Sequence, residues 1–263
     1  MIILKIGGGA AINIDGIMSD LANLQERAVI VHGANALRDK LLQELGVEKK
    51  ILTSLSGYSS VFTDQTALDV LIMAYAGLRN KRIVELCQQN GLNAIGLSGI
   101  DGKVIQGKRN TGIKIEEHGK RRIVRDFSGK PQKVNVELLT WLMENHYLPV
   151  LCVPILDENN FAINSENDDI VTLLQYHLHA QKIVQFIEAP GFLKNPDDPD
   201  SLIKNMTKED LEQFEDTATL RMKRKVLALR KLFLSGAVSV LIADGRGEHP
   251  LVDALNGKGT TIK

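Results

Sequence analysis

Short apolar runs alternate with longer segments of helical periodicity along most of the chain. The runs are rich in Val, Ile and Leu and are continuous, which is typical of strands buried on both faces of a mainly parallel sheet. They predict strands at residues 2–6, 28–31, 92–96, 148–153, 182–187, 239–243 and 260–262. The segments between them predict helices at about residues 15–26, 35–45, 64–89, 134–146, 168–179, 207–215 and 219–236. This alternation favours an α/β fold, a three-layer α/β/α sandwich around a mainly parallel central sheet.

One stretch departs from this alternation. Residues 103–124 read as short strands punctuated by Gly107, Gly112 and Gly119, a pattern that predicts a β-hairpin appendage on one edge of the fold. The chain has 263 residues, enough for one large domain with a substantial core. We therefore expect a single domain over residues 1–263, with an N-lobe of about residues 1–165 and a C-lobe of about residues 166–263.

The overall composition excludes several classes of protein. The 32 basic and 32 acidic side chains cancel, which argues against nucleic acid or a membrane surface as a partner. No apolar run reaches the length that spans a bilayer, and the apolar N-terminal run is too short for a signal peptide. The two cysteines, Cys87 and Cys152, lie in apolar surroundings and predict buried, reduced thiols. A cytoplasmic location is the expectation.

The first predicted strand ends in a lysine followed by glycines, Lys5-Ile6-Gly7-Gly8-Gly9. Glycines after a parallel strand let backbone N–H groups approach an anion closely. The motif is neither a Walker A sequence nor GxGxxG, and a simple turn is the alternative interpretation. Lys5 favours the anion site, because a lysine at the end of a buried strand is costly unless it meets a negative charge.

Two further segments follow predicted strands or begin predicted helices. The second strand ends in His32-Gly33-Ala34, so two glycine turns are expected at the carboxyl ends of parallel strands, where α/β proteins bind ligands. Asn164 and Asp168 precede an apolar helical run. They are interpreted either as a helix cap with acids favoured by the dipole, or as a substrate hydrogen-bonding residue and an organising carboxylate.

A cluster of cations opens a long predicted helix at Arg221-Met222-Lys223-Arg224-Lys225. Cations at a helix N-terminus oppose the helix dipole. A negatively charged ligand would resolve that conflict, and a solvated basic face is the alternative.

These residues together resemble a known family. Lys5-Ile6-Gly7-Gly8, His32-Gly33, Asn164 with Asp168, and Met222-x-x-Lys225 fall in the order and spacing of the amino acid kinase family, in its N-acetylglutamate kinase branch. The resemblance covers essentially the whole chain. Five blocks are most similar to the LysW-dependent kinases of lysine biosynthesis: Thr63-Asp64, residues 78–86, residues 93–99, residues 221–225 and Ala243-Asp244.

The resemblance implies an activity and a set of roles. Those enzymes use ATP to phosphorylate the side-chain carboxylate of α-aminoadipate or glutamate whose amino group is attached to the small acidic carrier LysW. By analogy Lys5 and Lys225 would flank the transferred phosphoryl group, and Asp168 would hold the two lysines. The remaining roles implied are substrate binding by His32, Gly33, Ala34, Val61 and Asn164, and ATP binding by Gly7, Gly8, Gly191 and Met222. Mg²⁺ would be held mainly by the nucleotide phosphates, with no protein metal site.

Some positions depart from the family pattern. Ala34 replaces the second glycine of the substrate turn, and Val61 stands where relatives carry an arginine for the substrate α-carboxylate. Ile187-Glu188 replaces a small polar residue followed by an acid or amide, and Leu220 replaces a glycine. These departures leave three hypotheses: a LysW-dependent aminoadipate or glutamate kinase, an N-acetylglutamate kinase of arginine biosynthesis, and a regulatory homologue without turnover.

Charge is distributed unevenly despite the zero sum. Residues 103–133 carry three acidic side chains (Glu116, Glu117, Asp126) and ten basic ones: Lys103, Lys108, Arg109, Lys114, Lys120, Arg121, Arg122, Arg125, Lys130 and Lys133. A solvated basic hairpin is one interpretation. The other is a docking surface for the acidic carrier, whose binding salt would weaken.

A homodimer is also implied by the resemblance. The predicted helix at residues 64–89 contains an apolar run over residues 67–75 that could be buried on two faces. It is the candidate interface.

Overall fold

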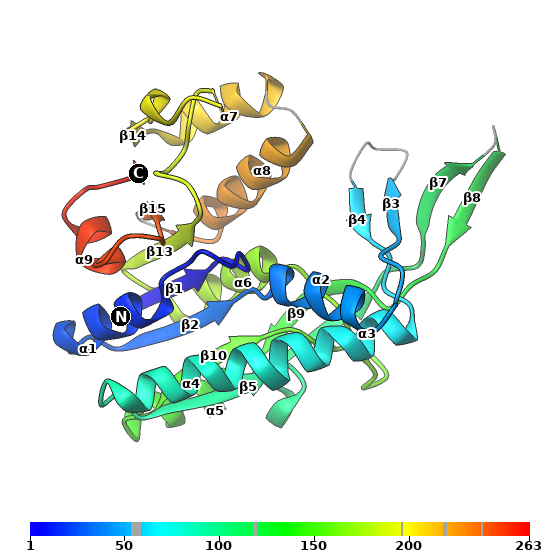
Figure 1. Ribbon diagram of the computed structural model, residues 1–263, viewed down its shortest axis with the longest axis horizontal. Coiled ribbons are helices and arrows are strands. Elements are labelled where there is room, and N and C mark those ends of the chain that lie inside the picture. The colour runs from blue at the N-terminus through cyan, green and yellow to red at the C-terminus, as the bar shows by residue number, and fades with distance from the viewer. Residues whose placement is uncertain (54–58, 118–119, 196, 218–219, 238) are drawn as a thin grey trace.

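The computed structural model describes residues 1–53, 59–117, 120–195, 197–217, 220–237 and 239–263. Eight of its strands form one sheet in the order β14-β16-β15-β13-β1-β2-β10-β5 (Figure 1). The strands are β1 (Ile2–Ile6), β2 (Ala28–His32), β5 (Ala94–Ser98), β10 (Leu148–Cys152), β13 (Lys182–Ile187), β14 (Asn205–Met206), β15 (Val240–Asp244) and β16 (Thr260–Ile262). Every neighbouring pair is parallel except β15 and β16. The prediction of a mainly parallel sheet is confirmed.

Helices cover both faces of this sheet because its strands are apolar on both sides. Alternate residues of β1 and β2, such as Leu4 and Ile30, pack with one group of helices: α1 (Ile14–Leu24), α4 (Asn80–Gln89) and α9 (Pro250–Leu255). The residues between them, such as Ile3 and Val31, pack with the other group: α3 (Gln65–Ile72), α5 (Val136–Glu144), α6 (Asn167–Leu178), α7 (Lys208–Thr217) and α8 (Leu220–Leu234). The sheet is therefore the middle of three layers, as predicted.

The predicted helix at residues 64–89 is one continuous helical stretch with a wider turn inside it. Asp64 caps its N-terminus by accepting a hydrogen bond from the Ala67 amide at 2.9 Å. α3 then passes into a π-helical segment, η1 (Met73–Arg79), before α4. A further helix, α2 (Asn35–Glu44), packs against η1.

The predicted appendage has two levels. Its base is a four-stranded sheet in the order β12-β11-β6-β9, formed by β6 (Ile105–Arg109), β9 (Gly129–Val134), β11 (Ile155–Leu156) and β12 (Ala162–Ile163). Beyond the base, β7 (Ile113–Glu117) and β8 (Lys120–Val124) form an antiparallel hairpin that we call the basic ribbon. A second hairpin, β3 (Ile51–Thr53) with β4 (Ser59–Val61), projects from the same end of the molecule (Figure 1).

Several predicted boundaries differ from the observed ones. The strand predicted at residues 92–96 begins two residues later, because Leu92 belongs to the exit of α4. Its amide donates to the Cys87 carbonyl at 2.8 Å, while Gly91 adopts a positive φ of 76°. The helix predicted from residue 134 begins at Val136, because Val134 pairs with Ile105 as the end of β9.

Helix α9 was not predicted. Its N-terminal amides, those of Leu251 and Val252, donate to the carboxylate of Asp20 at 2.9 and 3.2 Å. That cap comes from α1, about 230 residues away in sequence. A cap supplied by a distant segment leaves no local sequence signal.

Two other expectations concern the cysteines and membranes. Cys87 and Cys152 are buried free thiols, as predicted, and burial raises the pKa of each to about 12. Within the described parts of the chain, no helix combines the length and apolar character needed to cross a bilayer.

Candidate functional site

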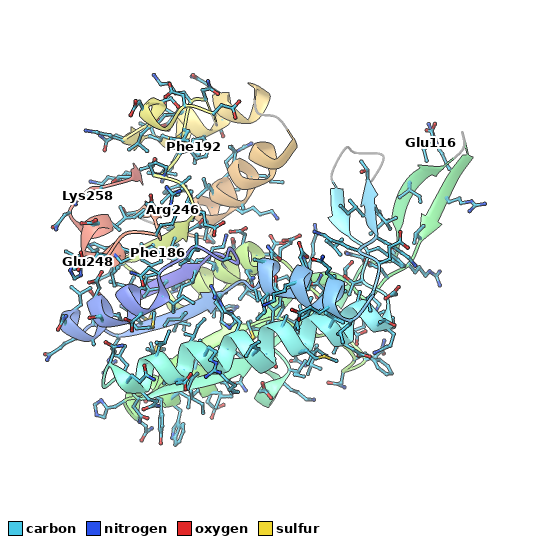
Figure 2. All side chains as sticks on the ribbon, in the orientation of Figure 1. Glu116, Phe186, Phe192, Arg246, Glu248 and Lys258 are labelled. Atoms are coloured by element: carbon cyan, nitrogen blue, oxygen red, sulfur yellow. The ribbon has the colours of Figure 1, made fainter. Side chains whose placement is uncertain are left out.

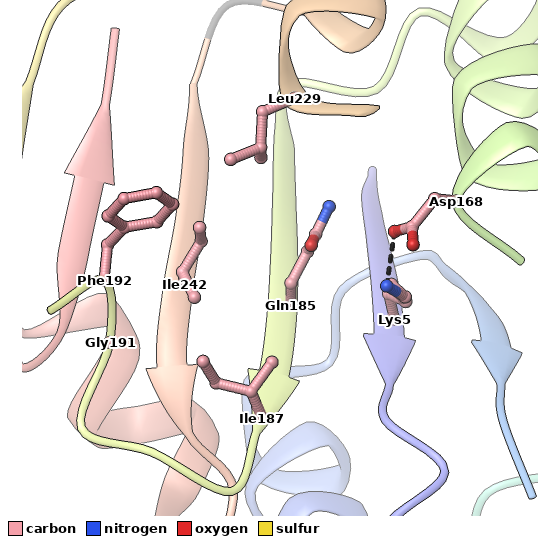
Figure 3. Close-up of a pocket in the computed structure, with 8 residues that line it drawn as sticks. All are labelled: Lys5, Asp168, Gln185, Ile187, Gly191, Phe192, Leu229 and Ile242. Atoms are coloured by element: carbon pink, nitrogen blue, oxygen red, sulfur yellow. Dashed lines mark hydrogen bonds and ion pairs between the residues drawn. The ribbon is translucent and has the colours of Figure 1, made fainter. Parts of the chain in front are cut away.

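Lys5 and Asp168 meet at the centre of the sheet. Lys5 lies on β1 and its Nζ forms a hydrogen-bonded ion pair with Oδ1 of Asp168, in the first turn of α6 (Figure 3). The two side chains are 17% and 30% exposed. The helix dipole favours an acid at this position. The chain thus meets the cost of a lysine in a buried strand with a carboxylate brought from 163 residues away.

A pocket lies beside this ion pair, between β1, β13, β15 and α8 (Figure 3). Its lining consists of Lys5, Asp168, Gln185, Ile187, Gly191, Phe192, Leu229 and Ile242. Three of these residues form one row across neighbouring strands, because Lys5 pairs in register with Gln185 and Gln185 with Ile242. We call this row the pocket floor.

The pocket floor changes character along its length. A cation on β1 is followed by a carboxamide on β13 and an aliphatic side chain on β15. Ile187, Phe192 and Leu229 extend the apolar end. Such a gradient suits an elongated ligand with an anionic end over Lys5 and a flat apolar end over β15.

The two glycine turns pack directly against each other. A Cβ added at Gly8 would lie 2.5 Å from the Asn35 amide nitrogen, and one added at Gly33 would lie 2.8 Å from the Gly8 nitrogen. Backbone hydrogen bonds run from Gly33 N to Ile6 O and from Ala36 N to Gly8 O, at 2.8 and 2.9 Å. Only residues without a Cβ allow this approach, which brings the first turn against the N-terminus of α2.

The first turn also contacts the end of β13. The carboxylate of Glu188 accepts a hydrogen bond from the Ala11 amide at 2.6 Å. A Cβ at Gly9 would lie 2.1–2.3 Å from that carboxyl group, so the glycine makes room for the glutamate. Arg79 of η1 reaches the same turn, with Nη2 donating to the Gly9 carbonyl at 3.4 Å.

His32 is fully buried, and its ring lies between the Gly33 carbonyl and Asn80 of α4. Its Nε2 lies 3.1 Å from Nδ2 of Asn80, whose amide also donates to the Val150 carbonyl at 3.0 Å. Burial lowers the pKa of His32 to about 3, and the nearby Arg79 lowers it further, against the contact with the Gly33 carbonyl. The imidazole is therefore neutral at physiological pH and contributes to the core, while its backbone belongs to the turn.

Two other predicted substrate residues, Val61 and Asn164, contact Thr63, which is 2% exposed. Asn164 donates from Nδ2 to Oγ1 of Thr63 at 3.2 Å, and that hydroxyl donates to the Val61 carbonyl at 3.3 Å. Asp126 accepts from the Thr63 amide at 3.4 Å. Ala34 is buried at the start of α2, beside the glycine turns.

Two predicted residues lie in the first turns of α8, at positions where the structure describes the backbone but not the side chains. Position 225 is one helical turn before Leu229, which lines the pocket, and position 222 is nearly one turn earlier. The side chains of Lys225 and Met222 lie outside the described residues. Gly191, also predicted from the resemblance, lines the pocket.

The donor set bears on how a metal could bind here. Among the residues that the structure describes, no group of three or more His, Cys, Asp or Glu side chains is placed to hold a metal ion. The carboxylate at the pocket, Asp168, is engaged by Lys5. Mg²⁺ keeps several waters and takes phosphate oxygens readily, so these residues fit an ion that arrives with a nucleotide.

Sequence reasoning missed Gln185 and Glu188. Gln185 stands inside the apolar run Lys182-Ile183-Val184-Gln185-Phe186-Ile187, and a polar residue in a buried strand is the same signal that singled out Lys5. Glu188 was noted only as a departure from a family pattern, and its contact with Ala11 needs the fold.

The whole chain is similar to known proteins. The sequence pattern of the amino acid kinase family matches residues 1–244. The chain is 39% identical over 269 residues to the [LysW]-aminoadipate kinase of Thermus thermophilus, and all of both chains is covered. It is 36% identical to the [LysW]-aminoadipate kinase of Deinococcus radiodurans, covering all of this chain and 91% of the relative.

A solved structure supports the fold independently. The carbamate kinase of Giardia lamblia bound to AMP-PNP superposes with a TM-score of 0.67 at 16% identity, over 99% of this chain and 97% of that one. The three-layer fold is therefore shared with an enzyme whose structure holds an ATP analogue.

Proposed function

Because the chain belongs to the amino acid kinase family, we propose that it phosphorylates the side-chain carboxylate of a LysW-bound α-aminoadipate, or the matching glutamate derivative, with ATP as the donor. The observation that carries the proposal is the Lys5–Asp168 pair at the head of a pocket whose floor runs from cationic to apolar. The identity of 36–39% with full-length [LysW]-aminoadipate kinases supports the choice of acceptor.

The nucleotide lies along the pocket floor, with its phosphates toward Lys5 and its base toward Ile242. The backbone amide of Gly8 and the N-terminus of α2 behind it favour the phosphates electrostatically. The Gly7 amide donates to the Phe186 carbonyl at 3.0 Å, so Gly7 contributes by bringing the turn close to the nucleotide. Gly191 borders the apolar end. Met222 and Lys225 would approach from α8.

The chemistry is transfer of the γ-phosphoryl group. An oxygen of the acceptor carboxylate forms a bond to the γ-phosphorus, and the bond from that phosphorus to the β,γ-bridging oxygen breaks, leaving ADP and an acyl phosphate. The acceptor is already an anion, so no proton has to be removed from it. Mg²⁺ bound with the nucleotide would neutralise part of the phosphate charge.

Among the described residues, Lys5 contributes most to stabilising the transition state. Donor and acceptor are both negative, so catalysis depends on positioning and on cations that meet charge developing in the transition state. Asp168 fixes the direction of the Lys5 ammonium group, and Lys225 would supply a second cation from the C-lobe. The boundary between the lobes is proposed near residue 165.

The acceptor is proposed to lie on the other side of the glycine turns. Its binding residues are the His32-Gly33-Ala34 turn, through the backbone, together with Val61 and Asn164. Asn164 is held by Thr63 and has further hydrogen-bonding capacity on its amide oxygen. A carrier that holds the amino group of the acceptor reduces the dependence on an α-carboxylate clamp at Val61.

The carrier is proposed to dock on the basic region at residues 103–133. The exposed cations there are Lys103, Lys108, Arg121, Arg122, Arg125, Lys130 and Lys133. Glu116 stands among them near the end of the basic ribbon (Figure 2). Ile123 is 65% exposed on β8, so the ribbon offers an apolar contact beside its charges. An acidic protein is attracted to such a surface.

The homodimer and the cytoplasmic location also remain proposals. Met73 and Leu78 on η1 are 51% and 44% exposed. A second copy covering them would bury apolar surface that the single chain leaves in water. Sedimentation of the purified protein tests this directly.

The decisive experiment is an ADP-release assay with three acceptors: carrier-linked aminoadipate, carrier-linked glutamate and free N-acetylglutamate. The expected result is ATP turnover with a carrier-linked acceptor and little with N-acetylglutamate. Efficient turnover of N-acetylglutamate without the carrier would instead identify an acetylglutamate kinase. ATP binding without ADP release for any acceptor would identify a homologue without turnover.

A further inference from the structure

Gln185 presents an unusual polar group to the pocket. It is 6% exposed and stands in the middle of β13, and its Nε2 has no hydrogen-bond partner among the described residues. Figure 3 shows the side chain rising from β13 between Leu229 and the Lys5–Asp168 pair. A buried amide donor left without an acceptor is destabilising, so its retention in a strand core calls for a function.

The neighbours of Gln185 restrict what can satisfy it. Lys5 carries only donors, and Ile187, Leu229 and Ile242 carry no polar side-chain atom. Asp168 is the one acceptor side chain of the lining, but α6 packs over β1 and β2, and Oδ1 of Asp168 is engaged by Lys5. The remaining possibility is that a bound ligand supplies the acceptor for Nε2 of Gln185.

The position of Gln185 in the pocket floor indicates which part of a ligand it meets. It pairs in register with Lys5 on one side and with Ile242 on the other. A nucleotide with its terminal phosphates at Lys5 and its base at Ile242 has its α-phosphate in between. An anionic oxygen is a strong acceptor for a carboxamide N–H.

We propose that Gln185 is a nucleotide-binding residue whose Nε2 donates a hydrogen bond to an α-phosphate oxygen. This inference rests on the proposed function, because it takes the orientation of ATP from it. It assigns to Gln185 a role common to ATP and ADP, whereas Lys5 acts on the transferred group.

The test is calorimetric binding of ATP, ADP and adenosine to wild type and Gln185→Leu, without an acceptor. Loss of a hydrogen bond to a charged acceptor is expected to lower the affinities for ATP and ADP by the same factor, about tenfold or more, and to leave the affinity for adenosine unchanged. Gln185→Glu replaces the donor with a group that repels phosphate, so it is expected to lower the affinity for ATP further than Gln185→Leu does. The melting temperature of Gln185→Leu is expected to stay level or rise, because an unpaired amide is removed.

Gln175→Leu is the matched control. Gln175 is a second buried glutamine, 1% exposed on α6, and its Nε2 donates to the carbonyls of Ala180 and Gly236 at 3.2 and 3.4 Å. Its loss is expected to lower the melting temperature and leave nucleotide affinity unchanged.

Three results would overturn the inference: unchanged affinity for ATP and ADP in Gln185→Leu, a loss confined to ATP, or an equal loss for adenosine. They are distinguishable from failure of the proposed function. If wild type does not bind ATP, the proposed function fails, whereas normal ATP binding by wild type with no effect of Gln185→Leu rejects only the role of Gln185.

Discussion

The pocket floor and the basic ribbon present charge in opposite ways. In the pocket, one cation is paired with Asp168 and held at a fixed place in a sheet register. On the ribbon, Arg121 lies in solvent on a two-stranded hairpin, and the exposed Arg125 follows directly after its second strand. Charge interactions in the buried site are strong and depend on geometry, whereas those on the ribbon are weak individually and are screened by salt. In the proposed function, the sheet therefore serves phosphoryl transfer and the ribbon serves recognition of the carrier.

Lys5→Met is expected to give the largest effect, and it tests whether the buried cation of this comparison acts in catalysis. Removing a cation aimed at developing charge typically lowers turnover about 10²- to 10³-fold. The measurement is ADP release at saturating ATP with carrier-linked acceptor. Lys258→Met is the control, because Lys258 is 73% exposed and pairs with Asp253 at the surface. If Lys5→Met kept most of its turnover, Lys5 would have no part in phosphoryl transfer.

Gly8→Ala tests how tightly the two glycine turns are packed. The new methyl group would meet backbone nitrogens at 2.5 and 2.9 Å, which cannot rotate away. Overpacking of this kind costs up to about 3 kcal/mol of unfolding free energy, measured by urea denaturation. Gly77→Ala is the control, because its Cβ would meet nothing closer than 3.7 Å. A Gly8→Ala protein as stable as wild type would show that the turns can separate without cost.

Lowering the pH is expected to destabilise the folded protein through His32, at the end of the central strand β2. Its pKa is about 3 in the folded protein and 6.5 when unfolded, so the unfolded chain binds the proton between these values. Stability is therefore retained above pH 6.5 and is lost as the pH falls toward 3. The difference between pH 7 and pH 5 is about 2 kcal/mol from this group.

The measurement is urea denaturation of wild type and His32→Leu at both pH values. The pH dependence of His32→Leu is expected to be smaller by that amount, whatever its absolute stability. An identical pH dependence in the two proteins would mean that His32 titrates normally in the folded state.

The double variant with Arg121→Ser and Arg125→Ser is expected to give the smallest effect. It tests whether the exposed cations of this comparison contribute to carrier binding. Exposed charge pairs contribute about 0.2–1 kcal/mol each, so losing two is expected to lower kcat/KM for the carrier-linked acceptor about twofold to thirtyfold. The deficit should shrink as salt is added, while the affinity for ATP stays the same. Arg27→Ser, an exposed arginine between α1 and β2, is the control. A deficit that did not respond to salt would contradict electrostatic docking on the ribbon.

The sequence predicted the central sheet well because its strands are continuous apolar runs. The residue ranges of β1, β13 and β16 agree with prediction. Strands of two residues, such as β11 and β14, carry too little pattern to be seen and exist because a neighbouring strand pairs with them. The extent of β9 was also missed, since Pro131 and the polar residues around it do not read as a strand.

Only part of the site was predicted from the sequence, and it was predicted from a different signal than the sheet. Lys5 and Asp168 could be found because each is unusual in its local context and their spacing resembles that of a family. Gln185 could not be linked to Lys5, because the pairing of two strands 180 residues apart depends on the order of strands in the sheet, which local periodicity does not encode. The burial of His32 likewise follows from Asn80 on a helix that packs behind β2.

The contact between Gly9 and Glu188 has a consequence for how this sequence can diverge. A side chain at position 9 would occupy the space that the Glu188 carboxyl group fills. Glu188 could be shortened while Gly9 stays, but a residue larger than glycine at position 9 would displace the carboxylate from its hydrogen bond with the Ala11 amide. A side chain at position 9 is therefore expected to accompany a change at position 188, although 179 residues separate the two positions.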